Sequence, residues 1–146
     1  KTLGLVQSAV ADGATLVTGG GIPENLPVGY YVQPTLLSDV DPTSTIAQTE
    51  IFGPVITVTP YDTDDEAVAI ANNTIYGLSG DVSSGSDERA LDIALRLRTG
   101  SVTTNNHSFF GITSPFGGTK QSGLGHRNGA EGYQEYLNMK TIGVRP

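Results

Sequence analysis

The chain has 146 residues, of which 37% are hydrophobic and 16% are charged, and this is enough to bury the core of one ordinary domain. Fifteen Asp and Glu residues against eight Lys and Arg give a net charge of −7, and the acidic residues are spread along the chain. We therefore expect no nucleic-acid partner, because neutralising phosphates requires a basic face. No apolar run approaches the roughly 20 residues of a membrane helix, so no membrane partner is expected either.

The absence of cysteine narrows the chemistry further. A disulfide framework, a thiolate zinc site and a cysteine nucleophile are all excluded within this chain. The two histidines, His107 and His126, lack the converging partners of a metal site or of a Ser-His-acid arrangement, so we predict no metal site. A cytoplasmic location fits this composition.

The first part of the chain predicts one helix and three strands. Leu3, Val6 and Val10 recur at helical spacing and predict a helix over residues 2–12, which Asp12-Gly13 ends. We expect strands over residues 14–18, 30–37 and 55–61. Pro34 suggests an edge position for the second strand, because proline cannot donate to a strand ladder.

Helix caps mark the next elements. Thr63 and Glu66 form a capping box for a helix that runs to about Asn73. Ser86 caps a helix over residues 87–98, and Gly100 stops it. The remaining predicted elements are strands at 78–82 and 101–104, a short helix from Asn128 through Leu137, and a strand at 140–144. This alternation predicts an α/β fold with a largely parallel sheet and flanking helices.

The segment Glu50-Ile51-Phe52-Gly53-Pro54-Val55 carries the first pattern with chemical meaning. A carboxylate such as Glu50 can accept hydrogen bonds from both hydroxyls of a ribose diol. Phe52 offers a flat apolar surface of the kind that supports a nicotinamide ring. The alternative is an ordinary loop acid beside a core phenylalanine.

A second block, Pro115-Phe116-Gly117-Gly118-Thr119-Lys120-Gln121-Ser122-Gly123, follows later in the chain. Its paired glycines let the backbone approach a ligand or a neighbouring strand closely. The alternative is a glycine-rich surface loop that only connects two elements.

Taken together, these blocks resemble the C-terminal part of the NAD(P)-dependent aldehyde dehydrogenases. Further segments in the same order carry the resemblance: Tyr30-Tyr31-Val32-Gln33-Pro34-Thr35, Ala71-Asn72-Asn73-Thr74-Ile75-Tyr76-Gly77-Leu78-Ser79, Gly100-Ser101-Val102, Asn105 and Glu135-Tyr136-Leu137-Asn138-Met139-Lys140-Thr141. The resemblance runs from about residue 1 to Val144.

The resemblance implies a role for four residues. Glu50 would bind the hydroxyls of the nicotinamide ribose of NAD or NADP, and Phe52 would pack near the nicotinamide ring. Phe116 would line the aldehyde tunnel, and Asn105 would lie on the loop that enters it. No catalytic residue is assigned within this chain.

The resemblance also implies a division of the chain. Residues 1–139 would form the C-terminal part of the catalytic domain, and residues 140–146 a closing strand that contributes to subunit association. The family oxidises an aldehyde to an acid through a cysteine thiohemiacetal and thioester, with hydride transfer to NAD(P)+ and a glutamate-activated water.

The cysteine, the base glutamate and the Rossmann-type cofactor domain lie N-terminal to this segment in the family. We therefore expect the chain to be a C-terminal piece of a longer dehydrogenase, inactive alone, and the start at Lys1 inside a predicted helix agrees with a fragment. Such a piece should associate with itself or with the missing N-terminal half. A non-catalytic dinucleotide-binding module (a split-enzyme subunit or pseudoenzyme) and an oligomerisation unit stay open as alternatives.

Overall fold

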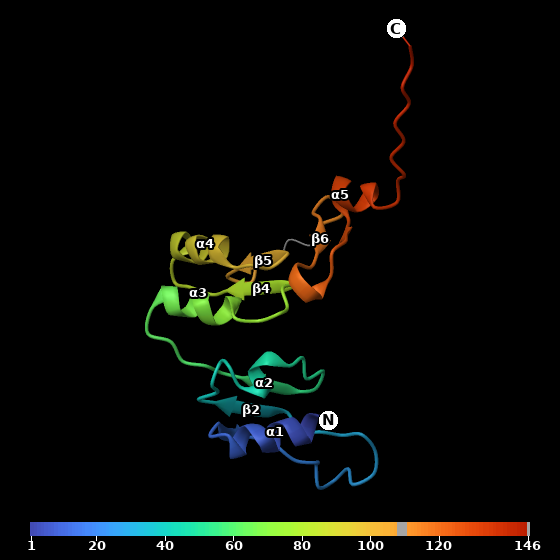
Figure 1. The fold of residues 1–146 in the computed structure, drawn as a ribbon. Helices are drawn as coiled ribbons and strands as arrows, with labels where there is room; N and C mark the ends of the chain where they lie inside the picture. Colours follow the sequence, from blue (N-terminus) through green and yellow to red (C-terminus); the bar gives the residue numbers. More distant parts are fainter. Residues whose placement is uncertain (108–110, 146) are drawn as a thin grey trace. The chain divides into compact units, whose positions relative to one another are not determined.

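The computed structural model describes residues 1–107 and 111–145, and it shows a mixed α/β chain. The chain divides into two compact units, Lys1–Asn73 and Thr74–Pro146, each with its own helices and small sheets (Figure 1). Within the described residues, no helix is both long enough and apolar enough to cross a membrane.

The first unit is built around a three-stranded sheet. Its elements are α1 (Thr2–Ala11), β1 (Thr15–Thr18), β2 (Thr35–Ser38), α2 (Thr45–Gln48), β3 (Val55–Thr57) and α3 (Asp64–Asn72). β2 is the central strand, antiparallel to β1 and parallel to β3. The predicted edge position of this segment is therefore wrong. Pro34 lies just before β2, where its missing N–H interrupts no ladder bond.

The core of the first unit is a cluster of five buried apolar residues: Val6, Ala9, Leu37, Val40 and Ile46. Val6 is 1% exposed and Leu37 is 0% exposed. The buried face of α1 is rotated from the predicted one, because Ala9 is buried while Val10 is 41% exposed. The prediction counted only the large apolar residues and therefore put Val10 on the buried face. In the structure the smaller Ala9 belongs to the core cluster instead.

The second unit combines two two-stranded sheets with two helices. Its elements are β4 (Ser79–Val82), α4 (Asp87–Arg96), β5 (Ser101–Thr104), β6 (Phe116–Gly117), the 3₁₀ turn η1 (Lys120–Ser122), β7 (His126–Arg127) and α5 (Gly129–Gln134). β4 and β5 are parallel, and α4 packs on both (Figure 1). β6 and β7 are antiparallel, with Phe116 opposite Arg127.

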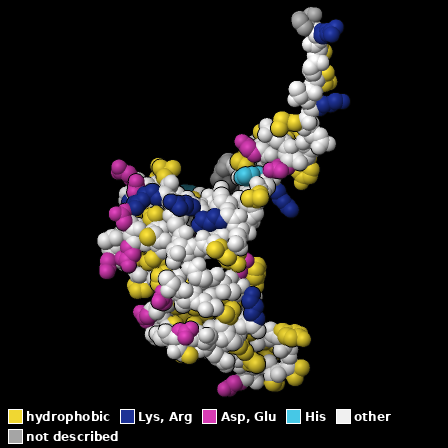
Figure 2. Space-filling view, viewed as in Figure 1, with side chains coloured by type: hydrophobic (Ala, Val, Ile, Leu, Met, Phe, Trp, Pro, Cys, Tyr) yellow, Lys and Arg dark blue, Asp and Glu magenta, His cyan; other side chains and the backbone are white. Residues whose placement is uncertain are grey.

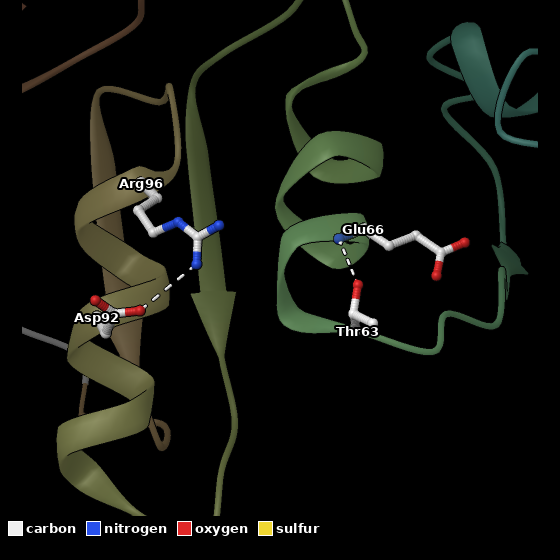
Figure 3. Close-up of polar contacts among 4 residues, drawn as sticks. All are labelled: Thr63, Glu66, Asp92 and Arg96. Atoms are coloured by element: carbon white, nitrogen blue, oxygen red, sulfur yellow. Dashed lines mark hydrogen bonds and ion pairs between the residues drawn. The ribbon is translucent and has the colours of Figure 1, made fainter.

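Two helix starts form as their sequences predict. The Thr63 hydroxyl accepts a hydrogen bond of 3.2 Å from the N–H of Glu66 at the start of α3 (Figure 3). The Glu66 carboxylate reaches back to the N–H of Asp62 at 2.8 Å. Ser86 caps α4 in the same way through the N–H of Arg89 at 3.3 Å. Each cap satisfies an N–H that the helix itself leaves without a partner.

α4 also carries an ion pair on its surface. The Arg96 guanidinium (Nη1) and the Asp92 carboxylate (Oδ2), one helical turn apart, lie 3.6 Å from each other (Figure 3). Because the Asp92 side chain is 70% exposed, solvent screens this pair and its contribution to stability is small.

The α/β class agrees with the sequence, whereas the single largely parallel sheet is not confirmed. Within the described residues the strands form three separate small sheets, with parallel pairs β2–β3 and β4–β5 and antiparallel pairs β1–β2 and β6–β7. The predicted closing strand is also not confirmed, because residues 138–145 adopt no regular structure and Pro146 lies outside the described residues. A strand needs a neighbour for its N–H and C=O groups, and among the described residues no strand pairs with this segment.

We expect Val6→Ala to lower the free energy of unfolding of the first unit by about 2 kcal/mol, because it removes two buried methyl groups and leaves a cavity. Val28→Ala is the matched control, since Val28 is 86% exposed, and it should change stability by less than about 0.5 kcal/mol. Native-state hydrogen exchange of the α1 and β2 amides measures both values. Equal effects of the two substitutions would contradict this assignment of the core.

Candidate functional site

The loop between α2 and β3 presents Glu50 and Phe52 to solvent. Ile51, between them, is partly buried and packs against the core cluster of the first unit. Glu50 is exposed, and Phe52 is 87% exposed. One inward side chain therefore anchors the loop while its two neighbours face outward.

The backbone at Phe52 is unusual. Its φ of +50° lies in the left-handed region, where a bulky side chain is rarely found. Such a conformation costs on the order of 1–2 kcal/mol and persists only where the surroundings fix it. The aromatic ring gains almost no burial in return, so folding of this unit alone does not explain the residue.

Three contacts hold this turn in place. The Lys1 ammonium donates to the Glu50 carbonyl at 3.0 Å. A Cβ at Gly53 would lie 2.8 Å from the Thr2 hydroxyl oxygen, so the loop touches the start of α1 there. On the other side, the Thr35 N–H donates to the Pro54 carbonyl at 2.8 Å, which joins the turn to β2. The sequence did not predict the hydrogen bond from Lys1 to Glu50, because these two residues are 49 positions apart in the chain.

The arrangement offers an exposed carboxylate and an exposed flat ring on one fixed turn. The carboxylate can accept two hydrogen bonds from adjacent hydroxyl groups, and the ring can support an apolar or aromatic face. These features suit one end of a ligand rather than a reaction centre, because the turn carries no nucleophile.

Asn105 lies directly after β5 in the second unit, and its side chain is engaged. Its amide oxygen accepts from the Ser84 N–H at 2.8 Å, and its amide nitrogen donates to the Asp87 carboxylate at 2.6 Å. The φ of Asn105 is +50°, which asparagine tolerates better than most residues. Asn105 thus joins the end of β5 to the loop before α4 and to the first turn of α4.

A second carboxylate joins β4 to β5. The Thr103 hydroxyl donates to Asp81 at 2.6 Å, and the Ser83 hydroxyl donates to it at 3.1 Å. The Thr103 hydrogen bond is the main cause of a lowered pKa of Asp81, and the Ser83 hydroxyl and the Asn106 N–H add to it. The carboxylate therefore stays ionised and ties the two strands together at neutral pH.

Phe116 lies on β6 and is partly buried, next to the buried backbone of Gly117 and Gly118. Glu50 and Phe52 thus share one turn of the first unit, whereas Asn105 and Phe116 lie on different elements of the second. Across the described residues, no three His, Cys, Asp or Glu side chains come close enough to hold a metal ion.

Comparison with known proteins identifies the family. The model of the aldehyde dehydrogenase family matches residues 1–142. The chain belongs to the aldehyde dehydrogenase family. A 3-succinoylsemialdehyde-pyridine dehydrogenase of a Pseudomonas species is 48% identical over 143 residues, or 97% of this chain. A betaine aldehyde dehydrogenase of Rhizobium johnstonii is 43% identical over 145 residues, or 99% of it.

Solved aldehyde dehydrogenases share the fold. The Mycobacterium tuberculosis enzyme complexed with NAD+ is 46% identical, with a TM-score of 0.86 over 92% of this chain. The Staphylococcus aureus betaine aldehyde dehydrogenase in complex with NAD+ is 39% identical, with a TM-score of 0.87 over 94% of it. This aldehyde dehydrogenase chain spans about 30% of the length of the curated relatives and 28% of these solved chains.

We expect Phe52→Asn to leave the free energy of unfolding unchanged or to raise it by up to about 1 kcal/mol, because asparagine tolerates the left-handed conformation and little burial is lost. Thermal unfolding of the whole chain measures this. A loss of more than about 1 kcal/mol would show that the ring serves the fold rather than a ligand.

We expect Asn105→Gly to lower the stability of the second unit by about 1–2 kcal/mol, because the Ser84 N–H and the Asp87 carboxylate each lose a hydrogen bond. Glycine keeps the positive φ accessible, so backbone strain is not added. Hydrogen exchange of the β5 and α4 amides reports the loss. Asn106→Gly is the control, since Asn106 also has a positive φ and its side chain is exposed.

Proposed function

We propose that this chain forms the C-terminal part of the catalytic domain of an NAD(P)-dependent aldehyde dehydrogenase and holds the nicotinamide end of the cofactor. Residues 1–139 belong to that part of the domain, and residues 140–146 are its closing strand. The observation that carries the proposal is the turn at Phe52, where a strained backbone exposes an aromatic ring beside an exposed carboxylate. Strain of this kind concentrates at ligand-binding positions.

The residues of this turn fit the nicotinamide ribose of NAD or NADP. The Glu50 carboxylate accepts hydrogen bonds from the ribose hydroxyls, and Phe52 packs beside the nicotinamide. NAD(P)+ held there would supply the hydride acceptor for the oxidation of the aldehyde. The related Mycobacterium tuberculosis and Staphylococcus aureus enzymes have been solved in complex with NAD+, which supports this choice of cofactor.

The second unit carries the residues of the proposed aldehyde tunnel. Phe116 lines the tunnel through which the aldehyde enters, and Asn105 fixes the loop at its entrance through Ser84 and Asp87. The nucleophilic cysteine and the base glutamate come from outside this chain, which holds no cysteine. The chain by itself is therefore inactive. Its proposed location is the cytoplasm.

The partner of the chain is the remainder of the dehydrogenase or a second copy. Large apolar side chains are exposed on both units, among them Val28, Tyr30, Ile112, Leu124 and Met139, each at least 86% exposed. Figure 2 shows apolar side chains over the surface of both units on the face that it draws. Apolar surface on this scale is typical of an interface. Residues 140–144 become a strand when a neighbouring chain or domain supplies the partner strand.

The test is complementation. The chain alone, mixed with NAD+ and an aldehyde, should produce no NADH. Co-expression with the part of the Pseudomonas 3-succinoylsemialdehyde-pyridine dehydrogenase that lies outside the matched segment should restore NADH production. NADH formed by the chain alone, or none formed by a stable co-purified complex, would contradict the proposal.

In the active complex, Glu50→Gln should raise the KM for NAD+ about tenfold, because hydrogen bonds to a charged acceptor are worth about 1.5–3 kcal/mol. Glu24→Gln is the matched control, since Glu24 is an exposed acid on another loop of the same unit. Steady-state kinetics with the aldehyde at saturation separates the two variants.

A further inference from the structure

The backbone of Gly77 is the meeting point of three segments of the second unit. Its carbonyl accepts hydrogen bonds from the N–H of Gly100 at 3.1 Å, the N–H of Thr119 at 2.8 Å and the Thr119 hydroxyl at 3.1 Å. Its own N–H donates to the Ser122 hydroxyl at 2.9 Å. Gly77 itself is buried, and its hydrogen bonds with the Thr119 and Ser122 hydroxyls are partly buried.

Residues 119–122, here called the clip, bind the same loop at two further points. The N–H of Gln121 donates to the Ile75 carbonyl at 2.9 Å, and the Lys120 ammonium donates to the Thr74 carbonyl at 3.0 Å. Lys120 has a φ of +54°, an uncommon conformation for a lysine. The clip is therefore held in its shape by the loop that it binds.

Close backbone packing extends the contact toward Phe116. A Cβ at Gly100 would overlap the carbonyl oxygen of Gly117, and a Cβ at Gly77 would overlap the Thr119 hydroxyl. The backbone one residue after Phe116 thus lies directly against the loop before β5.

The fully buried apolar side chains of the second unit lie outside the clip. Where the structure describes the second unit, its buried apolar residues are Val82, Ala90 and Ile93, all on β4 and α4. From residue 111 to residue 145, the buried positions are the glycines 117, 118 and 132. Hydrogen bonds and close glycine contacts therefore contribute to the attachment of β6 to β4 and β5.

We propose that Thr119 and Ser122 are positioning residues that fix the Phe116 ring relative to β4 and β5. Each hydroxyl bonds directly to the Gly77 backbone, and the clip begins three residues after Phe116. This inference rests on the proposed function only in its consequence: if Phe116 lines the aldehyde tunnel, the two hydroxyls control aldehyde binding without touching the aldehyde.

The first test uses the whole chain and needs no activity. 4-Fluorophenylalanine is placed at position 116, and its fluorine resonance is recorded with Thr119→Val and with Ser122→Ala. Both variants should shift or broaden the resonance, and should speed exchange of the Gln121 amide about tenfold, the equivalent of one hydrogen bond. The Gln121 N–H donates to the Ile75 carbonyl, and neither substitution removes that carbonyl, so faster exchange would report a change in the clip as a whole.

Thr99→Val is the matched control, because the Thr99 hydroxyl donates to the Ser101 carbonyl at 2.8 Å outside the clip. It should leave the fluorine resonance and the Gln121 exchange unchanged. An unchanged resonance in both clip variants, or the same change with Thr99→Val, would overturn the proposal.

The second test uses the complemented enzyme. Thr119→Val and Ser122→Ala should raise the KM for the aldehyde about tenfold, equivalent to about 1.4 kcal/mol, and leave the KM for NAD+ unchanged. Equal rises in both KM values would indicate a general loss of structure and would overturn the positioning role. If the unsubstituted complex forms no NADH, the proposed function fails, and the fluorine measurement alone decides the proposal.

Discussion

The apolar cluster formed by Val6, Ala9, Leu37, Val40 and Ile46 is the interaction on which the candidate cofactor surface depends. It holds α1 and α2 to the sheet, and Ile51 packs against it from the loop that follows α2. Because Ile51 is anchored in this way, its two neighbours in the chain, Glu50 and Phe52, can both be exposed to solvent. The left-handed backbone at Phe52 is tolerated because Lys1 and Thr2 on one side and β2 on the other hold the turn.

The second unit is stabilised by a different kind of interaction. Among its described residues, the buried apolar side chains are Val82, Ala90 and Ile93 on β4 and α4, and hydrogen bonds to backbone groups help to attach the segments that carry Asn105 and Phe116. Hydrogen bonds depend on distance and angle, whereas apolar burial is largely non-directional. A polar attachment of this kind therefore defines the position of a loop more closely than a loosely packed apolar contact would.

The surface of the chain supports the proposal that further segments or a second copy pack against it. The curated relatives are about three times longer, since the chain spans about 30% of them. Many large apolar side chains stay exposed, and residues 138–145 pair with no strand in the part of the chain that the structure describes. Both features follow if the neighbouring segments or subunits complete the packing, because apolar surface and unpaired strand backbone are costly in water.

The sequence by itself determined the local elements and the family. Thr63 and Ser86 start their helices as predicted, and the strands β1, β4 and β5 fall within one residue of the expected ranges, because caps and strand preferences act over a few residues. The blocks around Glu50 and Phe116, taken together with further segments in the same order, indicated the aldehyde dehydrogenase family, which the family model over residues 1–142 confirms. The short α2 and the two-residue strands β6 and β7 were missed, since they are too short to show a period.

Only the tertiary structure decided how the elements pair and which side chains are engaged. The central position of β2, the small separate sheets and the link from Lys1 to Glu50 depend on residues far apart in the chain. The same holds for Asn105, which binds Ser84 and Asp87, and for the clip, which binds the loop at Gly77. Such contacts form when distant backbone groups find their hydrogen-bond partners, and no local pattern of residue types specifies those partners.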